Sequence, residues 1–597
     1  MGSRLFGSRT RLIIMTLGAG FAILIIRLFY LQVVQADMWK EKASSQQMYS
    51  TSISANRGNI YDRNMKTLAK SVTVWTVFIS PAEMEEDQRE LVASGLSEIL
   101  DVDYEKSLKP WRYNETIKKK VDNDTADEVT AFIKENDIKG IYLSEDTMRY
   151  YPYGNLASTV LGFTGNDGTG AYGLEAYYNK TLSGTNGVIA SVRNAKGTAM
   201  PFSEQQIYDA EDGQSLVLTI DETVQHYLEK HLENAVQEHE VQNRAVGIVM
   251  NVKTGEILGM STKPDFDPND PQDFSANLAY LTEQVQAEPE LYTIYKKDEN
   301  GNYLRDENGQ KIVDEEADYT GTYRDIQWKN KTITELYYPG SVFKVITAAM
   351  GVDSGKATYY TTFNCSGAYG VAKETYHCAG KKSHGVQNLA EALRNSCNIY
   401  LIQLGQRLGP SVFYDYFDAF GFTERTGVDL PNETGMMKYY TKSQLGEVEL
   451  SSSSFGQAMA VTPLQVCTAI SAAVNGGYLV TPHVVDKITD QNGNVVEEIG
   501  ANVRRQVISK SASETIRQIM EFEVGDGTQG GGGNAYVAGY RIGGKSGTSE
   551  QLNMDRRADG DYKKVASFAA VLPANDPEIL VYVMLDDPNN ARTDYSS

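Results

Sequence analysis

Three short motifs in this chain carry residues that could activate a serine nucleophile. They are Ser341-Val-Phe-Lys344, Ser396-Cys-Asn398 and Lys545-Ser-Gly-Thr548. They fit the patterns S-x-x-K, S-x-N and K-[ST]-G, which belong to serine acyl-transfer chemistry. Any one such string arises by chance in a long chain. All three in this order, at this spread, are poorly explained as ordinary helix caps and turns.

The spacing of the first motif suits a nucleophile and its base. A serine hydroxyl is a weak nucleophile without a base nearby, and residues three apart share one face of a helix. Gly340 precedes the motif and an apolar run, 345–350, follows it. This pattern predicts a turn that enters a buried helix, with the serine at its start. We therefore expect Ser341 to attack and Lys344 to accept its proton, with the lysine pKa lowered by burial beside other cations.

The other two motifs would complete the site. Ser396 adds a hydroxyl for proton relay, and Asn398 adds an amide that orients the substrate. The glycines of 543–548 let backbone approach a substrate, which predicts a strand at the edge of a sheet. We expect the amides of Ser341 and Thr548 to form an oxyanion hole. We expect Lys545 and the hydroxyls of Ser546 and Thr548 to bind a carboxylate of the substrate. The residues expected at the substrate are Lys545, Ser546, Gly547 and Thr548.

Length and charge constrain the class of protein. The 597 residues indicate several domains, since one domain usually takes about 100–200 residues. The net charge is −22, from 56 basic and 78 acidic residues, so nucleic acid is not an expected partner. We divide the chain into a cytoplasmic tail, a transmembrane anchor, a non-catalytic domain and a catalytic domain, at 1–11, 12–34, 35–235 and 236–597.

The N-terminal region predicts a membrane anchor. Residues 12–26 are nearly all apolar, and 28–34 continue the run past Arg27, which is long enough to span about 30 Å of hydrocarbon. Arginines at positions 4, 9 and 11 precede it, which places the N-terminus in the cytoplasm and the catalytic domain outside the cell. Without an A-x-A site, we expect the anchor to be retained. Arg27 could snorkel to the interface or face a partner helix.

Longer strings in the chain resemble those of one protein family. Together with the three motifs and the anchor, they are similar to the class B penicillin-binding proteins, which are monofunctional peptidoglycan transpeptidases. The sporulation-type and elongation-type enzymes of Gram-positive bacteria are the nearest in pattern, and the sequence does not separate these two. The strings are Arg57-Gly-Asn-Ile-Tyr-Asp-Arg63, Arg149-Tyr-Tyr-Pro152, Gly173-Leu-Glu175, Tyr338-Pro-Gly-Ser-Val-Phe-Lys344, Phe455-Gly-Gln457 and Thr462-Pro-Leu-Gln465.

The resemblance implies both a fold and an activity. The fold is α+β: a transmembrane helix, an elongated β-rich pedestal (dimerisation-like) domain, and a transpeptidase domain with a five-stranded antiparallel sheet sandwiched by helices. The activity is a DD-transpeptidase at the cell surface that cross-links peptidoglycan stem peptides through an acyl-Ser341 intermediate and binds β-lactams covalently. A polytopic membrane glycosyltransferase is the implied partner.

Other functions share parts of this pattern. A β-lactam sensor carries the same three motifs, but its serine domain usually follows several membrane spans. A non-catalytic activator of a membrane glycosyltransferase is the other alternative. A β-lactamase would need a positioned base for deacylation and usually lacks a pedestal. The single predicted span and the pedestal strings favour the transpeptidase.

The chain departs from the family pattern in three places. Ser546 stands where many members have threonine, and both residues supply a hydroxyl. The segment 265–325 is longer than expected, and its acidic, polar composition predicts a solvated excursion. The family normally adds a further strand and a long helix after the strand at 579–584, and the chain reaches Ser597 soon after that strand.

The cysteines predict a structural zinc site and no catalytic cofactor. Cys365 and Cys378 lie close to His384, with His377 as an alternative ligand, and such a cluster suits tetrahedral zinc with a fourth ligand that the sequence does not identify. A Cys365–Cys378 disulfide is the main rival outside the cytoplasm, and free thiols are the third alternative. The remaining two, Cys397 and Cys467, are expected to be small buried hydrophobes.

Overall fold

The computed structural model describes residues 2–35, 48–102, 115–192, 206–287, 292–299, 301–527, 531–550 and 562–589. The chain forms two compact units, residues 1–56 with 184–212 and residues 57–183 with 213–597. The last residues, whose relation to the family pattern was left open above, lie outside the described part from 590 onward.

The first unit holds the predicted anchor. Helix α1 (Gly2–Phe29) continues into a π-helical turn, η1 (Tyr30–Val34). Within it, Ile13–Val34 has a mean hydropathy of 2.1 and is long and apolar enough to cross a membrane, so it fits a single-pass anchor. A small antiparallel sheet completes this unit in the order β1-β6-β7, formed by Met48–Ile53, Gly187–Val192 and Gln206–Tyr208.

The second unit begins with a seven-stranded sheet in the order β17-β16-β8-β2-β3-β4, with β5 paired to β3. Helices α3 (Arg89–Leu100) and α4 (Asn123–Glu135) pack their apolar faces on β3 and β5. Two of the strands come from a hairpin late in the chain. The strands are β2 (Ile60–Tyr61), β3 (Thr67–Ile79), β4 (Glu115–Val121), β5 (Ile141–Tyr150), β8 (Ser215–Leu218), β16 (Val485–Thr489) and β17 (Val495–Glu498). The boundary expected near 236 falls at the end of helix α8 (Glu222–Glu238) and stays a prediction.

Three of the family-like strings meet in one buried ion cluster beside this sheet. The carboxylate of Glu175, on the short helix α6 (Gly173–Tyr177), accepts from Arg57 Nε at 2.5 Å and from Arg149 Nε at 2.6 Å. The Glu175 side chain is fully buried. A buried carboxylate is stable only when it is paired and hydrogen-bonded. The strings are therefore joined because each supplies one member of a single charge network.

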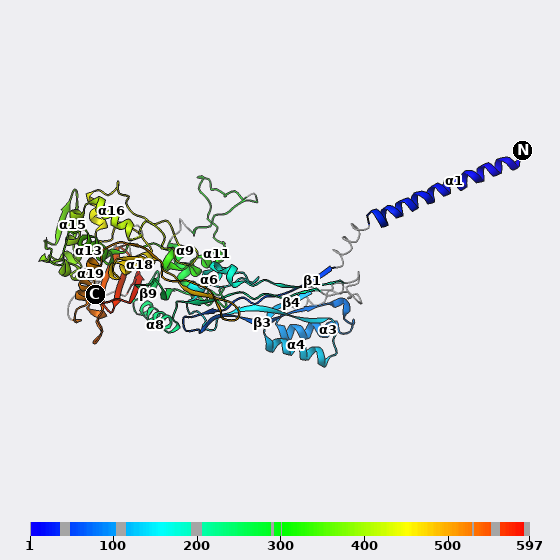
Figure 1. Ribbon diagram of the computed structural model, residues 1–597, viewed down its shortest axis with the longest axis horizontal. Helices are drawn as coiled ribbons and strands as arrows, with labels where there is room; N and C mark the ends of the chain where they lie inside the picture. The colour runs from blue at the N-terminus through cyan, green and yellow to red at the C-terminus, as the bar shows by residue number, and fades with distance from the viewer. Residues whose placement is uncertain are drawn as a thin grey trace. The chain divides into compact units, whose positions relative to one another are not determined.

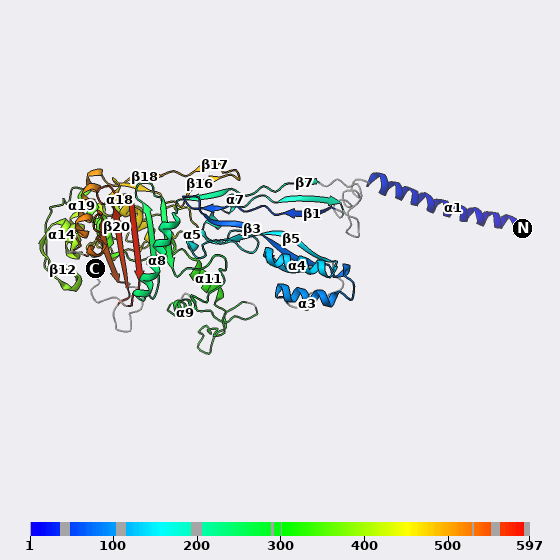
Figure 2. The same ribbon diagram turned by 90° about the horizontal axis from the view of Figure 1, so that it is seen from below.

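The catalytic domain is built on a five-stranded antiparallel sheet in the order β10-β9-β21-β20-β19 (Figure 2). This confirms the sheet that the resemblance implied. Its central strand β21 pairs with β9 on one side and β20 on the other. The strands are β9 (Ala245–Asn251), β10 (Ile257–Lys263), β19 (Gly543–Glu550), β20 (Lys564–Leu572) and β21 (Ile579–Asp586).

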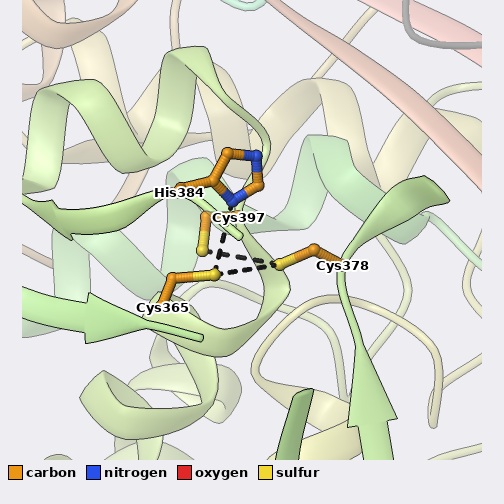
Figure 3. Close-up of side chains that lie close together, drawn as sticks. All are labelled: Cys365, Cys378, His384 and Cys397. Carbon is orange, nitrogen blue, oxygen red and sulfur yellow. Dashed lines mark hydrogen bonds between the residues drawn. The ribbon is translucent and has the colours of Figure 1, made fainter. Parts of the chain in front are cut away.

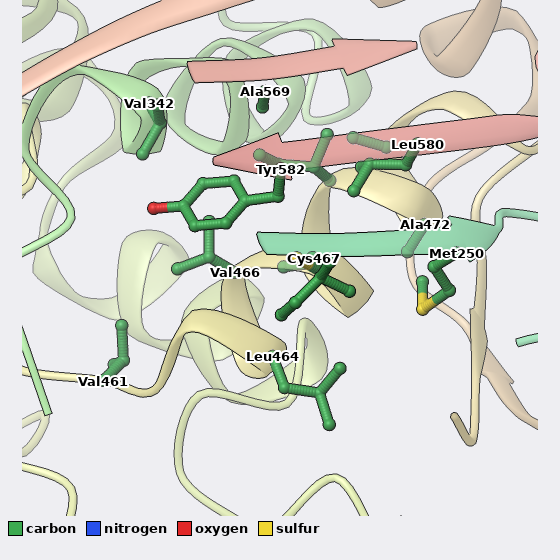
Figure 4. Close-up of a cluster of buried hydrophobic side chains, with 14 of the residues drawn as sticks. Met250, Val342, Val461, Leu464, Val466, Cys467, Ala472, Ala569, Leu580 and Tyr582 are labelled. Carbon is green, nitrogen blue, oxygen red and sulfur yellow. The ribbon is translucent and has the colours of Figure 1, made fainter. Parts of the chain in front are cut away.

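Helices cover both faces of this sheet. Because side chains alternate along a strand, Val249 and Val581 face one side, where they pack with Leu228 of α8. Their neighbours Met250 and Tyr582 face the other side and pack in the main core with helix α18 (Pro463–Val474), which is buried throughout (Figure 4). The buried helices α13 (Lys344–Asp353), α15 (Asn398–Leu408) and α19 (Lys510–Val524) extend that core and carry site residues.

The segment 265–325 contains more regular structure than the sequence predicted. Helices α9 (Leu278–Ala287) and α11 (Thr320–Trp328) stand at its two ends. Between them, bridges such as Tyr295↔Val313 and Arg305↔Lys311 form a narrow ladder that projects from the domain (Figure 1). Its turns are solvent-exposed, as the polar composition indicated.

The remaining elements connect these layers. The other helices and helical turns are η2 (Pro81–Glu83), α5 (Ser158–Leu161), α7 (Asn179–Leu182), α12 (Lys331–Thr334), η4 (Gly340–Phe343), η5 (Ala379–Lys381), α14 (Leu389–Arg394), α16 (Pro410–Ala419), α17 (Glu447–Ser453) and η6 (Gly533–Ala535). The short strands are β11 (Phe363–Cys365), β12 (Ala368–Val371), β13 (Glu374–His377), β14 (Gly385–Gln387), β15 (Tyr478–Val480) and β18 (Val503–Gln506).

Candidate active site

The 3-10 turn that carries Ser341, the nucleophile turn, contacts strand β19 and the Phe455-Gly-Gln457 string. Ser341 lies in the 3-10 turn η4, which leads directly into helix α13 at Lys344, so a turn enters a buried helix as predicted. The serine lies in that turn, one turn before the first residue of the α-helix. Gly340 has φ of +57°, and a Cβ there would stand 2.5 Å from the Thr548 carbonyl oxygen. Its amide donates to the Gly456 carbonyl at 2.9 Å. Glycine is thus required where the turn meets both β19 and the Phe455-Gly-Gln457 string.

Lys344 is fully buried and reaches the second motif. Its Nζ donates to the Ser396 carbonyl at 2.7 Å and to Ser396 Oγ at 3.1 Å. Burial, with the nearby positive charge of Lys545 adding to it, lowers the pKa of Lys344 to about 7. A lysine with such a pKa can hold or release a proton near neutral pH, which is what a general base requires.

The second motif sits at the start of helix α15. Ser396 has φ of +48°, a left-handed conformation that residues other than glycine seldom adopt. Asn398 is the first residue of the helix, and its Nδ2 donates to the His377 carbonyl oxygen at 2.9 Å. The contact between Lys344 and Ser396 therefore joins the first two motifs, while Asn398 ties the second to strand β13.

Strand β19 lies at the edge of the five-stranded sheet and carries the third motif. A Cβ on Gly547 would stand 2.5 Å from Ser567 Oγ and 2.8 Å from Val342 Cγ1, so only glycine lets β19 approach the nucleophile turn. The amide of Ser546 donates to a side chain of α19 and not to β20. Because amide directions alternate along an antiparallel strand, the peptide groups of Ser546 and Thr548 point to the open edge of β19, which faces away from β20. The oxyanion hole expected from the Ser341 and Thr548 amides stays a prediction.

The side chain that binds this edge is Glu523, a residue that sequence reasoning missed. Lys545 is fully buried, and its Nζ donates to Glu523 Oε1 at 2.9 Å and to the Ser546 carbonyl at 3.0 Å. A signal was present: the buried face of α19 includes Ala512, Ile516 and Ile519, and Glu523 is the one acidic residue that falls on that face at helical spacing.

A second polar cluster lies against the second motif (Figure 3). Cys365 Sγ stands 3.6 Å from Cys378 Sγ and 3.4 Å from His384 Nδ1, and Cys378 Sγ stands 3.6 Å from Cys397 Sγ. All four ligand atoms lie within 4.8 Å of one another. Hydrogen bonding from the Cys397 thiol lowers the pKa of Cys378, which favours the thiolate that metals bind.

The structure revises two expectations about this cluster. Cys397 is buried, as expected, but it is also a member of the polar group, so the fourth candidate ligand comes from inside the Ser396-Cys-Asn398 motif. His377 is not in the group within the described part of the chain; it ends strand β13 and its side chain is exposed. Cys467 is fully buried in α18, as expected of a small hydrophobe.

The whole described chain is similar to known proteins. The model of the penicillin-binding protein transpeptidase domain matches residues 245–597, and that of the penicillin-binding protein dimerisation domain matches residues 52–218. Stage V sporulation protein D of Bacillus subtilis is 33% identical over 97% of this chain and 82% of its own length. The probable peptidoglycan D,D-transpeptidase PenA of Neisseria gonorrhoeae is 25% identical over 97% of this chain and 88% of its own.

Solved structures agree on the fold. Penicillin-binding protein 2X from Streptococcus thermophilus superposes with a TM-score of 0.69 at 22% identity, covering 92% of this chain and 78% of the other. Penicillin-binding protein 3 from Mycobacterium tuberculosis, in complex with aztreonam, gives 0.62 at 24% identity over 90% and 91% of the two chains. The chain therefore belongs to the class B penicillin-binding proteins, the family of peptidoglycan D,D-transpeptidases that bind β-lactams.

Proposed function

We propose that Ser341 forms the acyl-enzyme through which this protein cross-links peptidoglycan stem peptides. The observation that carries this assignment is the placement of Lys344, which is buried one turn from Ser341 and within hydrogen-bond distance of Ser396. In this scheme the neutral Lys344 amine accepts the Ser341 proton as Oγ attacks the carbonyl carbon of the D-Ala–D-Ala peptide bond. The amides of Ser341 and Thr548 hold the developing oxyanion.

Acylation of Ser341 and transfer of the acyl group to the acceptor amine use the same proton relay. As the tetrahedral intermediate collapses, the C–N bond breaks and the leaving D-alanine amine takes the proton, relayed between Lys344 and Ser396. The amine of a second stem peptide attacks the acyl-serine, gives up one proton by the same route, and restores the Ser341 hydroxyl. Lys545, with the hydroxyls of Ser546 and Thr548, binds the terminal carboxylate of the donor, and Asn398 orients its peptide group.

A β-lactam would follow only the first half. Its ring amide carbonyl takes the place of the peptide carbonyl, the ring C–N bond breaks, and the acyl group stays on Ser341. This protein should consume a peptide ending in D-Ala–D-Ala in the presence of an amine acceptor and release one D-alanine for each product. Ser341→Ala should do neither and should not bind penicillin, although it should fold normally. Product formation by that variant would overturn the proposal.

We also infer that Cys365, Cys378, Cys397 and His384 hold a structural zinc ion. Tetrahedral zinc with Zn–S of about 2.3 Å and Zn–N of about 2.0–2.1 Å places two sulfurs about 3.8 Å apart and a sulfur about 3.6 Å from the nitrogen. The distances of 3.6 Å and 3.4 Å in the cluster suit that donor set. Because Cys378 has two thiols at equal distance, the cluster supports shared metal ligation better than a Cys365–Cys378 disulfide. The ion would fasten 365–384 to the start of α15 and leave catalysis to the serine and lysines.

The membrane arrangement completes the proposal. The basic residues that precede the apolar span Ile13–Val34 support a cytoplasmic N-terminus and an extracellular catalytic domain. Arg27 lies inside the apolar span Ile13–Val34, and arginines within a span usually face a protein partner or the interface. With the resemblance above, this supports a polytopic membrane glycosyltransferase as partner. Arg27→Leu should reduce cross-linking to that partner in membranes while leaving penicillin acylation unchanged; unchanged cross-linking would contradict a role for Arg27.

A further inference from the structure

Glu523 is a buried carboxylate at a position where the fold does not need one. It lies on the face of α19 that packs on β19 and the core, next in line after Ile516, Ile519 and Met520. An apolar residue would serve packing there. A carboxylate is retained at a buried position only when it is paired, so its partners indicate what it does.

Both partners of Glu523 belong to the third motif. Its Oε1 accepts from Lys545 Nζ at 2.9 Å and from the Ser546 amide at 3.2 Å. Its Oε2 accepts no hydrogen bond among the described residues. One oxygen thus fixes the lysine head and one peptide group of the open edge of β19. The same edge carries Thr548 two residues further on.

The charges around Glu523 explain why such an anchor is useful. Lys545 from β19 and Lys344 from α13 both act on it, and both lysines are fully buried. The two lysines have opposite tasks, since Lys344 must be neutral to accept a proton while Lys545 must be charged to bind a carboxylate. Buried like charges compete, so only one of them is favoured in the charged form without help. Glu523 contacts Lys545, whereas Lys344 contacts the neutral Ser396.

We propose that Glu523 is a positioning residue that keeps the Lys545 ammonium charged and aimed along the open edge of β19, so that this lysine can bind the substrate carboxylate. It touches neither the scissile bond nor the nucleophile and acts through Lys545. This inference rests on the proposed role of Lys545 in binding the substrate carboxylate. It adds Glu523 as the residue that stabilises the positive charge of that lysine in a buried site.

The test compares a penicillin with its methyl ester, which lacks the negative charge. Second-order acylation rates are measured on full-length protein at pH 8, above the pKa of Glu523, which burial raises to about 7. At this pH wild type should acylate about tenfold or more faster with the acid than with the ester. Glu523→Gln keeps the volume but removes the charge. Its acid preference should fall towards about one, because the Lys545 ammonium loses the carboxylate that holds it.

Two variants control for shape and for general charge. Glu523→Asp retains the charge with a shorter reach and should keep most of the acid preference. Glu521→Gln changes a carboxylate on the same helix whose partner is Arg541, and it should behave as wild type. An unchanged acid-to-ester ratio in Glu523→Gln would overturn the proposal. So would an equal loss of rate with acid and ester together with a lowered melting temperature, which indicates a purely structural role.

A double variant covers the case in which Glu523→Gln does not fold. Glu523→Gln with Lys545→Met removes both buried charges together, and it is compared with Lys545→Met alone. If Glu523 acts only through Lys545, the two proteins should acylate alike, because residues that work as a unit are not additive. A further tenfold loss in the double variant would contradict the proposal. Failure of wild type to acylate Ser341 at all would instead refute the proposed function.

Discussion

The Nζ atom of Lys344 lies 3.1 Å from the Oγ atom of Ser396, although the two residues are 52 positions apart in the chain. This contact joins the helix that follows the nucleophile to the turn that begins α15. In the proposed mechanism this contact passes the Ser341 proton onward from Lys344 to Ser396. Loss of Lys344 should therefore affect acylation more than loss of any other residue except Ser341.

Replacing Lys344 by alanine should slow penicillin acylation by about 10²-fold or more, which is the usual effect of removing a general base. The cavity it leaves will also affect stability, so melting temperature is measured in parallel. Lys442→Ala, which removes an exposed lysine paired with Asp415, serves as the control. Acylation by Lys344→Ala within a few fold of wild type would remove this lysine from the role of base.

Acylation by wild-type enzyme should depend on pH with an inflection near 7. Burial lowers the pKa of Lys344 from 10.5 to about 7, and the active form is the neutral amine. The rate should therefore be highest above pH 7 and should fall as pH decreases through about 7, with a slope of one decade per pH unit. Stopped-flow measurement with a fluorescent penicillin gives the profile. A rate that stays flat down to pH 5.5 would show that no base titrates in this range.

Removing zinc should lower the melting temperature and slow acylation together, because the segment 365–384 packs against the Ser396-Cys-Asn398 motif. Loss of a ligand from a small zinc site commonly costs several kcal/mol of folding free energy. Elemental analysis should give about one zinc per chain, and Cys378→Ser should abolish it. Cys467→Ser, at a buried thiol in α18 outside the cluster, should retain the metal. Negligible metal, with Cys365 and Cys378 oxidised as a pair, would establish the disulfide instead.

The Glu175 cluster should be a determinant of stability and not of catalysis. Glu175→Ala leaves the buried guanidinium groups of Arg57 and Arg149 without their shared carboxylate, and breaking a buried pair typically costs about 3–5 kcal/mol. Asp415→Ala removes one partner of an exposed pair and should change stability by about 1 kcal/mol or less. Denaturant unfolding measures both. The penicillin acylation rate of folded Glu175→Ala should match wild type; a loss comparable to that of Lys344→Ala would contradict this assignment.

Most residues of the candidate active site could be predicted from the sequence, because each motif indicates both the chemistry of its side chains and the local backbone geometry. Gly340 predicted a turn before the nucleophile, and the structure shows the close contacts that require glycine there. The glycines of 543–548 were expected to let backbone approach a substrate, whereas the close contacts at Gly547 are with Ser567 and Val342. Strand β19 was expected at a sheet edge and lies at one. The resemblance supplied the five-stranded sheet, which no local pattern could have specified because its strands come from both ends of the catalytic region.

Other features depend on contacts between distant segments. Helical spacing puts Glu523 on the apolar face of α19, but only the packing of α19 on β19 shows that it pairs with Lys545. Cys397 is the middle residue of the Ser396-Cys-Asn398 motif, so the sequence did not indicate that it belongs to the thiol cluster. It does so because α15 lies beside strand β13. The joining of Arg57, Arg149 and Glu175 likewise needed the fold. In each case the missing information was which two elements pack together.

The most direct measurement of the central claim is mass spectrometry of the full-length protein after reaction with penicillin. One equivalent of drug should be added, and digestion should locate it on the peptide that contains Ser341, with no adduct on Ser341→Ala. An adduct on another residue, or none on a folded wild-type protein, would contradict the assignment of Ser341 as the acylated nucleophile.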